Sequence, residues 1–103
     1  MVNLAGQKNK VMDKKLITRL LQLLLPYRPA RISIFGSYAR GENSENSDLD
    51  ILIQFKDRMS LLKLVQIEQE LSDKLGIPID LVTENSLKNP RLKNYIEKDL
   101  ISL

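Results

Sequence analysis

Residues 32–55 read ISIFGSYARGENSENSDLDILIQF, and they carry the clearest structural signals in the chain. Two apolar runs, residues 32–35 and 49–55, lie on either side of a polar loop. Both runs are short and rich in β-branched and aromatic residues, as is typical of strands that pack into a core. The stretch therefore predicts two strands joined by a loop that begins with a Gly-Ser step and ends with two aspartates.

Helical and extended patterns follow one another through the rest of the chain. The expected elements are a helix over 14–25 capped by Asp13, a helix over 61–75 capped by Ser60, a strand over 77–83, and a last helix opened by Asn89-Pro90. Apolar stripes are expected on the last two helices, formed by Leu61, Leu64, Ile67, Leu71 and Leu75 and by Leu92, Tyr95, Ile96 and Leu100. The order helix–strand–strand–helix–strand–helix predicts an α/β (α+β) fold, in which a small mixed sheet of three or more strands packs against helices. We expect one domain over 13–103 and a flexible tail over 1–12.

The composition narrows the chemistry. The 103 residues include no cysteine and no histidine, which excludes disulfides, thiolate metal sites and histidine-dependent catalysis. Any metal ion must then be bound by oxygen, which favours magnesium, manganese or calcium. A net charge of +3, with three tyrosines and two phenylalanines as the only aromatic residues, disfavours a nucleic-acid surface. The leucine-rich run at 16–25 is too short to span a membrane, so the cytoplasm is the expected location.

Two aspartates stand one residue apart at the start of the second apolar run. Side chains two apart in a strand share a face, so the carboxylates of Asp48 and Asp50 can converge on a bound cation. A lone Asp-x-Asp is more often a solvated turn or a helix cap. A third acid, Asp80, lies in the apolar run at 77–83, where a buried charge needs a partner. That partner is either a cation shared with the first two aspartates or a basic side chain.

The Gly-Ser step follows the first strand directly. Gly36 has no side chain, so a phosphate can approach its backbone closely. A short helical turn over 37–40 would direct free N–H groups at that phosphate. The Ser37 hydroxyl can donate another hydrogen bond, and Arg40 can add positive charge. Together with the aspartates, these residues predict a nucleotide site.

The spacing of these residues resembles a known signature. Gly36-Ser37, ten residues, then Asp48-x-Asp50 resembles the DNA polymerase β nucleotidyltransferase superfamily. Within it, GSYARGENSENSDLDILI is similar to the minimal nucleotidyltransferase (MNT) family, and the resemblance runs from the first strand to the third. It implies a polymerase-β-like fold and the transfer of AMP from ATP to a hydroxyl, with two Mg²⁺ ions.

The resemblance also implies a role for each site residue. Asp48 and Asp50 are expected to bind both magnesium ions. Asp80 matches the third metal-site carboxylate of the family by its place in the third strand, and it would hold the ion nearest the attacking hydroxyl. Gly36 and Ser37 would grip the β- and γ-phosphates, and Arg40 would neutralise the leaving pyrophosphate.

The motif does not name the acceptor of the nucleotide. Larger relatives carry additional domains for their second substrate, and none is expected in 103 residues. MNT proteins are often paired with a HEPN-domain toxin, which active members silence by adenylylating a tyrosine, so we expect a HEPN-type partner. Two alternatives stay open: a non-catalytic antitoxin that covers its partner, and nucleotidyl transfer to RNA or a small molecule. Homo- or hetero-oligomerisation is left open too.

Overall fold

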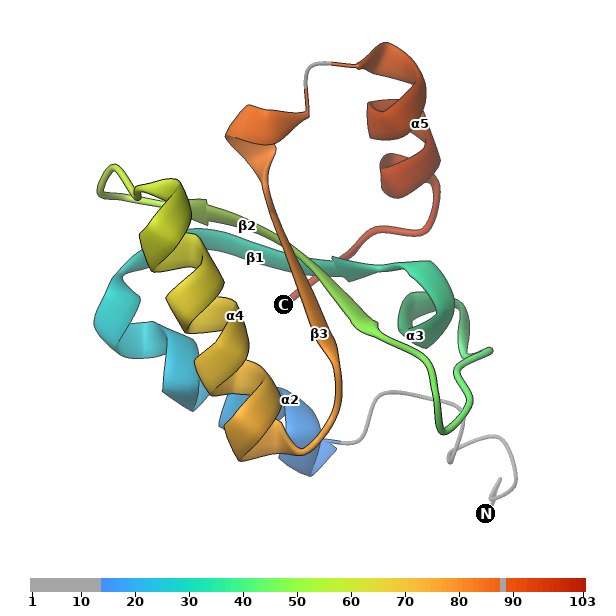
Figure 1. Ribbon diagram of the computed structural model, residues 1–103. Coiled ribbons are helices and arrows are strands. Elements are labelled where there is room, and N and C mark those ends of the chain that lie inside the picture. The colour runs from blue at the N-terminus through green and yellow to red at the C-terminus, as the bar shows by residue number, and fades with distance from the viewer. Residues whose placement is uncertain (1–13, 88) are drawn as a thin grey trace.

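The computed structural model describes residues 14–87 and 89–103, and at its centre is a mixed four-stranded sheet in the order β3-β2-β1-β4 (Figure 1). The strands are β1 (Pro29–Phe35), β2 (Leu49–Phe55), β3 (Ile79–Thr83) and β4 (Ile101–Ser102). β1 runs antiparallel to both β2 and β4, whereas β2 and β3 run parallel. The predicted mixed sheet is confirmed. β4 was not predicted, because a two-residue strand shows no alternation.

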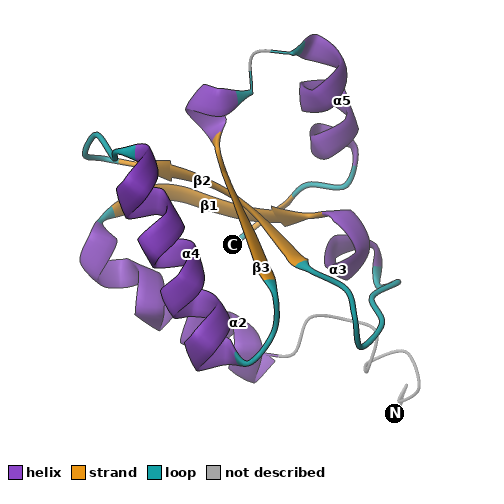
Figure 2. Ribbon diagram, in the orientation of Figure 1, coloured by secondary structure: helices purple, strands orange, loops and turns teal. Residues whose placement is uncertain are grey.

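Helices cover both faces of this sheet. They are α2 (Lys14–Leu24), η1 (Leu25–Tyr27), α3 (Gly36–Arg40), α4 (Leu61–Leu75), η2 (Glu84–Ser86) and α5 (Pro90–Lys98). α2 and α4 lie on one side of the strands, and α5 lies on the other (Figures 1 and 2). The predicted tail at 1–12 and the predicted Asp13 cap lie outside the described residues.

Alternation along the strands divides the core between the two faces. Ile34 of β1 and Ile51 of β2 belong to the large cluster under α2 and α4. Their strand neighbours Phe35 and Leu52 point the other way and pack with Ile96 of α5. By the same alternation, Asp50 faces the α5 side of the sheet.

Local signals set the ends of α4. The Ser60 hydroxyl oxygen accepts a hydrogen bond from the Lys63 N–H at 3.1 Å, which confirms the predicted cap. Gly76 ends the helix with a φ of 72°, a left-handed conformation that glycine adopts at little cost. Two side chains of α4 also hold the outer edge of β3. The Ser72 hydroxyl accepts from the Ile79 N–H at 3.1 Å, and Glu68 accepts from the Leu81 N–H at 2.8 Å.

Three expectations about the helices were wrong in detail. α2 stops at Leu24, because the chain tightens into the 3-10 turn of η1 before Arg28 takes a left-handed conformation. Leu61 is 77% exposed, since it lies about 100° round α4 from the buried line through residues 67 and 71. On α5, Leu92 and Tyr95 are exposed and Ile96 alone is fully buried.

No helix in the described ranges combines the length and apolarity needed to cross a bilayer.

Candidate active site

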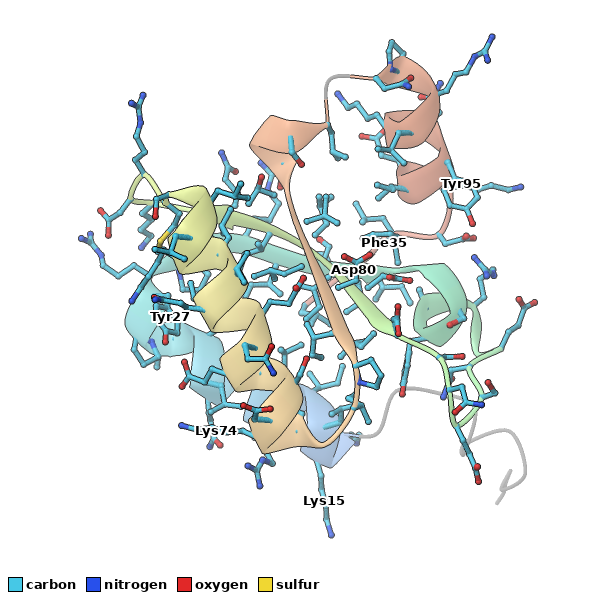
Figure 3. The ribbon with its side chains drawn as sticks, viewed as in Figure 1. Lys15, Tyr27, Phe35, Lys74, Asp80 and Tyr95 are labelled. Atoms are coloured by element: carbon cyan, nitrogen blue, oxygen red, sulfur yellow. The ribbon has the colours of Figure 1, made fainter. Side chains whose placement is uncertain are left out.

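The sheet brings two of the three predicted acids together. Asp50 of β2 and Asp80 of β3 are partners in the parallel register. Asp50 is also the partner of Phe35 in β1, so the acids lie on the sheet face covered by α5 (Figure 3). Asp48 lies one residue before β2 and is exposed, and its charge acts on Asp50. Asp50 and Asp80 therefore lie side by side near the N-terminal ends of the parallel pair β2 and β3, and Asp48 lies at the entrance to β2.

Asp80 reaches this position for a different reason than expected. The sequence placed it in a buried strand, but the structure leaves Asp80 exposed, so burial does not demand a partner for it. Instead, the N–H groups of its neighbours Ile79 and Leu81 are held by Ser72 and Glu68 of α4. These bonds fix the edge strand on the helix and hold Asp80 in line with Asp50.

Burial and the neighbouring acids together raise the pKa of Asp50. Its pKa is raised from 3.8 to about 6, first by burial, then by the charges of Asp80 and Asp48, and by hydrogen bonding to Asp80. The positive charge of Arg40 opposes this rise. A cation bound here would relieve the repulsion between the carboxylates, and this favours a metal site over a solvated turn.

The raised pKa predicts how stability depends on pH. The folded state binds a proton on Asp50 more tightly than the unfolded chain does, so this stabilisation is present below pH 3.8 and is lost as the pH rises through about 6. Asp50→Asn removes the titrating group. The free energy of unfolding of the variant minus that of the wild type should therefore grow by about 1–2 kcal/mol from pH 4 to pH 7, after allowance for solvent screening. Urea unfolding without divalent cations measures this difference. Parallel pH profiles would contradict the prediction.

Gly36 lies directly against Asp50. It is buried and has a φ of 74°, and a Cβ added to it would stand 2.2 Å from the Asp50 Oδ2 atom. The sequence explained this glycine by the approach of a phosphate. The structure shows a closer constraint, because only glycine leaves room for the Asp50 carboxylate beside the start of α3. The expected helical turn at 37–40 is confirmed, and Ser37 lies in its first turn.

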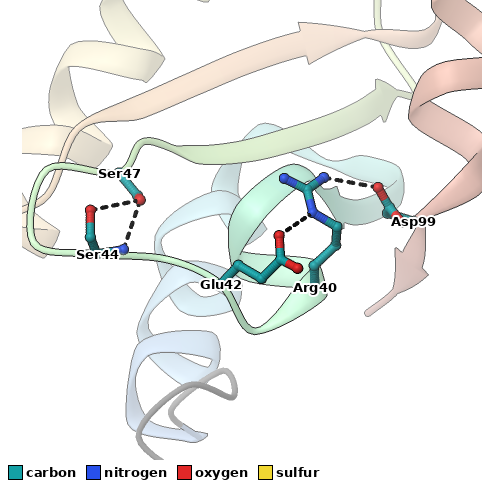
Figure 4. Close-up of polar contacts among 5 residues, drawn as sticks. All are labelled: Arg40, Glu42, Ser44, Ser47 and Asp99. Carbon is teal, nitrogen blue, oxygen red and sulfur yellow. Dashed lines mark hydrogen bonds and ion pairs between the residues drawn. The ribbon is translucent and has the colours of Figure 1, made fainter.

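Arg40, at the end of α3, is bound by two carboxylates. Its Nε donates to Glu42 Oε1 at 2.8 Å and its Nη1 donates to Asp99 Oδ2 at 2.9 Å (Figure 4). These contacts raise the pKa of the guanidinium above its ordinary value, Glu42 first and Asp99 second. No local sequence pattern indicates Asp99, because it follows α5 and lies 59 positions away from Arg40.

The loop between α3 and β2 is folded on itself just before the first acid. The Ser44 N–H donates to the Ser47 hydroxyl oxygen at 2.8 Å (Figure 4). The Ser47 N–H donates to the Ser44 carbonyl at 3.1 Å. These two bonds close a tight turn next to Asp48. The turn sets where the chain enters β2 and so where the Asp48 carboxylate stands.

The donor set can be compared with what a metal ion requires. Within residues 14–87 and 89–103, no three acidic side chains are gathered closely enough to enclose an ion. Mg²⁺ usually takes only one or two carboxylates and completes its shell with water and substrate phosphate oxygens. The neighbouring pair Asp50 and Asp80 fits that requirement, and Asp48 is a third candidate ligand at the strand entrance.

Comparisons with known proteins agree with this geometry. The model of the nucleotidyltransferase domain family matches residues 13–103. A protein of Methanocaldococcus jannaschii, named as a proposed protein adenylyltransferase, is 56% identical over 75 residues, which are 73% of this chain and 76% of that protein. The protein adenylyltransferase MntA of Thermococcus cleftensis is 45% identical over 67 residues, covering 65% of this chain and 68% of its own length.

Solved structures share the fold. One described as a proposed minimal nucleotidyltransferase superposes with a TM-score of 0.72 at 36% identity, covering 89% of this chain and 97% of the other. A toxin–antitoxin structure with AMP-PNP gives a TM-score of 0.71 at 26% identity, covering 88% of this chain and 72% of the other. The mixed sheet, the Gly-Ser turn against the acidic strand and these matches together show that the chain belongs to the nucleotidyltransferase domain family and is a nucleotidyltransferase of the minimal type.

Proposed function

We propose that this protein transfers AMP from ATP to a hydroxyl group of a partner protein, with Mg²⁺, and that the transfer silences that partner. The observation that carries the proposal is the paired Asp50 and Asp80, with Gly36 of α3 packed against the Asp50 carboxylate. This arrangement puts the first N–H groups of a short helical turn beside an acidic pair, as a metal-bound triphosphate requires. In this proposal, residues 13–103 act as one nucleotidyltransferase domain in the cytoplasm.

Each site residue then has a role. Asp48, Asp50 and Asp80 would hold the magnesium ions, which when bound neutralise phosphate charge. Ser37 and the backbone at Gly36 would bind the β- and γ-phosphates, and Arg40 would face the leaving pyrophosphate. The acceptor oxygen forms a bond to the α-phosphorus, the bond from that phosphorus to the bridging oxygen breaks, and pyrophosphate leaves. Asp80 is exposed on the edge strand. It would hold the ion nearest the acceptor hydroxyl and so favour loss of the hydroxyl proton.

The nature of the partner rests on the relatives. The Thermococcus protein is named a protein adenylyltransferase, and the structure solved with AMP-PNP is a toxin–antitoxin complex. The resemblance of residues 36–53 to the MNT family adds a HEPN-type toxin and a tyrosine hydroxyl. We therefore infer an antitoxin that adenylylates a tyrosine of a HEPN-type toxin.

Labelled ATP tests the proposal. The purified protein is incubated with Mg²⁺, lysate of its host cells and ATP labelled at the α-phosphorus, and the Asp48→Asn, Asp50→Asn double variant serves as control. A labelled protein band that disappears in the control and with EDTA is the expected result. ATP labelled at the γ-phosphorus should give no band that depends on Asp48 and Asp50, because the γ-phosphate leaves with pyrophosphate.

The other outcomes decide between the alternatives. Label in RNA or in a small molecule would replace the protein acceptor by that class of substrate. A partner that is bound and silenced without any label would show an antitoxin that acts by covering its partner. Label that persists in the double variant would contradict the assignment of the aspartates.

A further inference from the structure

Arg40 is held from two directions. Glu42, two residues further along the chain, is 66% exposed and binds Nε. Asp99 comes from the other end of the chain, its side chain is only 20% exposed, and it binds Nη1 at 2.9 Å. Because its surroundings restrict the Asp99 carboxylate, this second contact fixes the guanidinium more firmly than the exposed one does.

Asp99 is itself anchored on the face of the sheet that carries the acids. It directly follows α5, whose Ile96 packs with Phe35 and Leu52, and Leu100 packs against the same cluster. Phe35 precedes Gly36 and is the register partner of Asp50. The position in which α5 packs on the sheet therefore determines where Asp99 lies relative to the acidic strand.

Arg40 and the acidic strand are joined by one short helix. Arg40 ends α3, which begins at Gly36, and Gly36 lies directly against the Asp50 carboxylate. The bonds to Glu42 and Asp99 use Nε and Nη1, and among residues 14–87 and 89–103 no partner takes Nη2, which can bind an anionic ligand. A guanidinium held in this way is already oriented before the phosphates arrive, which avoids the cost of ordering it during the reaction.

We propose that Asp99 is a positioning residue for nucleotidyl transfer: it holds the Arg40 guanidinium towards the leaving pyrophosphate and links the seat of α5 to the active site. The inference rests on the proposed function. It assigns a role in the reaction to a residue outside the Gly-Ser and Asp-x-Asp motifs, brought to the site by the packing of the last helix.

The kinetics of Asp99→Asn test whether Asp99 positions Arg40 for the reaction or only stabilises the fold. Negative charge on pyrophosphate grows as the bond to the α-phosphorus breaks, so a loosened Arg40 should lower kcat for AMP transfer about tenfold, less than the loss of a whole donor. KM for ATP should not rise, because the substitution also removes a negative charge that repels the triphosphate. Asp99→Glu keeps the charge and should recover most of kcat. Asp57→Asn is the control, because it breaks an ion pair with Arg28 that is more than half exposed on both sides.

A second readout does not depend on activity. ¹⁵N relaxation of the Arg40 Nε–Hε group measures how mobile the guanidinium is. The group should be ordered in the wild type and mobile in Asp99→Asn, with and without magnesium pyrophosphate. An Arg40 signal that Asp99→Asn does not change would overturn the inference. So would a kcat of Asp99→Asn equal to that of Asp57→Asn, or a kcat of Asp99→Glu as low as that of Asp99→Asn. A wild-type protein that labels nothing would instead overturn the proposed function, while the resonance still tests the hold of Asp99 on Arg40.

Discussion

Asp50→Asn should lower the rate of AMP transfer at least about a thousandfold and leave the protein folded, with higher stability at neutral pH. Asp50 is the acid on which the other charges of the site act, and its pKa of about 6 reflects burial beside Asp80 and Asp48. An amide of the same shape keeps the packing against Gly36 but removes the charge that a magnesium ion needs. Activity and stability should therefore move in opposite directions.

This opposition makes the test specific. A variant that fails because it unfolds loses activity and stability together, whereas Asp50→Asn should melt no lower than the wild type at pH 7.5. Asp73→Asn on the exposed surface of α4 is the control, and it should keep wild-type transfer. Single-turnover transfer from labelled ATP and thermal unfolding without Mg²⁺ give the two quantities. Transfer by Asp50→Asn at the rate of the wild type would remove Asp50 from the reaction.

Much of this site could be predicted because its signals are local. The apolar runs of β1 and β2, the Ser60 cap and the Gly76 stop of α4 each depend on a few adjacent residues. The spacing between the Gly-Ser step and Asp48-x-Asp50 is local too, since one loop joins them. Such local patterns predict the helices and strands, and they place Asp48 and Asp50 at the start of β2.

Relations between distant segments could not be predicted in this way. The alignment of Asp80 with Asp50 depends on how far α4 carries the chain before β3 begins, and on the bonds from Ser72 and Glu68. Asp99 depends on where α5 packs, which no nearby pattern reports. The apolar neighbours of Asp80 predict a buried side chain. The strand instead lies at the edge of the sheet, and the Asp80 side chain is exposed.

Gly36→Ala should destabilise the fold by about 3 kcal/mol and abolish transfer, from overpacking and a left-handed backbone together. The new Cβ would meet the Asp50 Oδ2 atom at 2.2 Å, at a φ of 74° that side chains rarely adopt. Gly76→Ala is a matched control, because its φ is 72° and nothing lies within 4 Å of the added Cβ. It should cost only about 1 kcal/mol, the price of the backbone conformation alone. Urea unfolding of both variants separates the two contributions.

A double-mutant cycle shows whether the Asp50 carboxylate causes the difference. In an Asp50→Ala background, the nearest atom to the new Cβ is the Cβ of residue 50 at 3.5 Å, an ordinary van der Waals contact. Gly36→Ala should then cost no more than Gly76→Ala, which gives a coupling energy of about 2 kcal/mol between positions 36 and 50. A cost that stays near 3 kcal/mol without the carboxylate would mean that the glycine is required by the backbone of α3. A coupling near the expected value would show that the Gly-Ser turn and the acidic strand form one unit, in which the carboxylate is placed by the absence of a side chain opposite it.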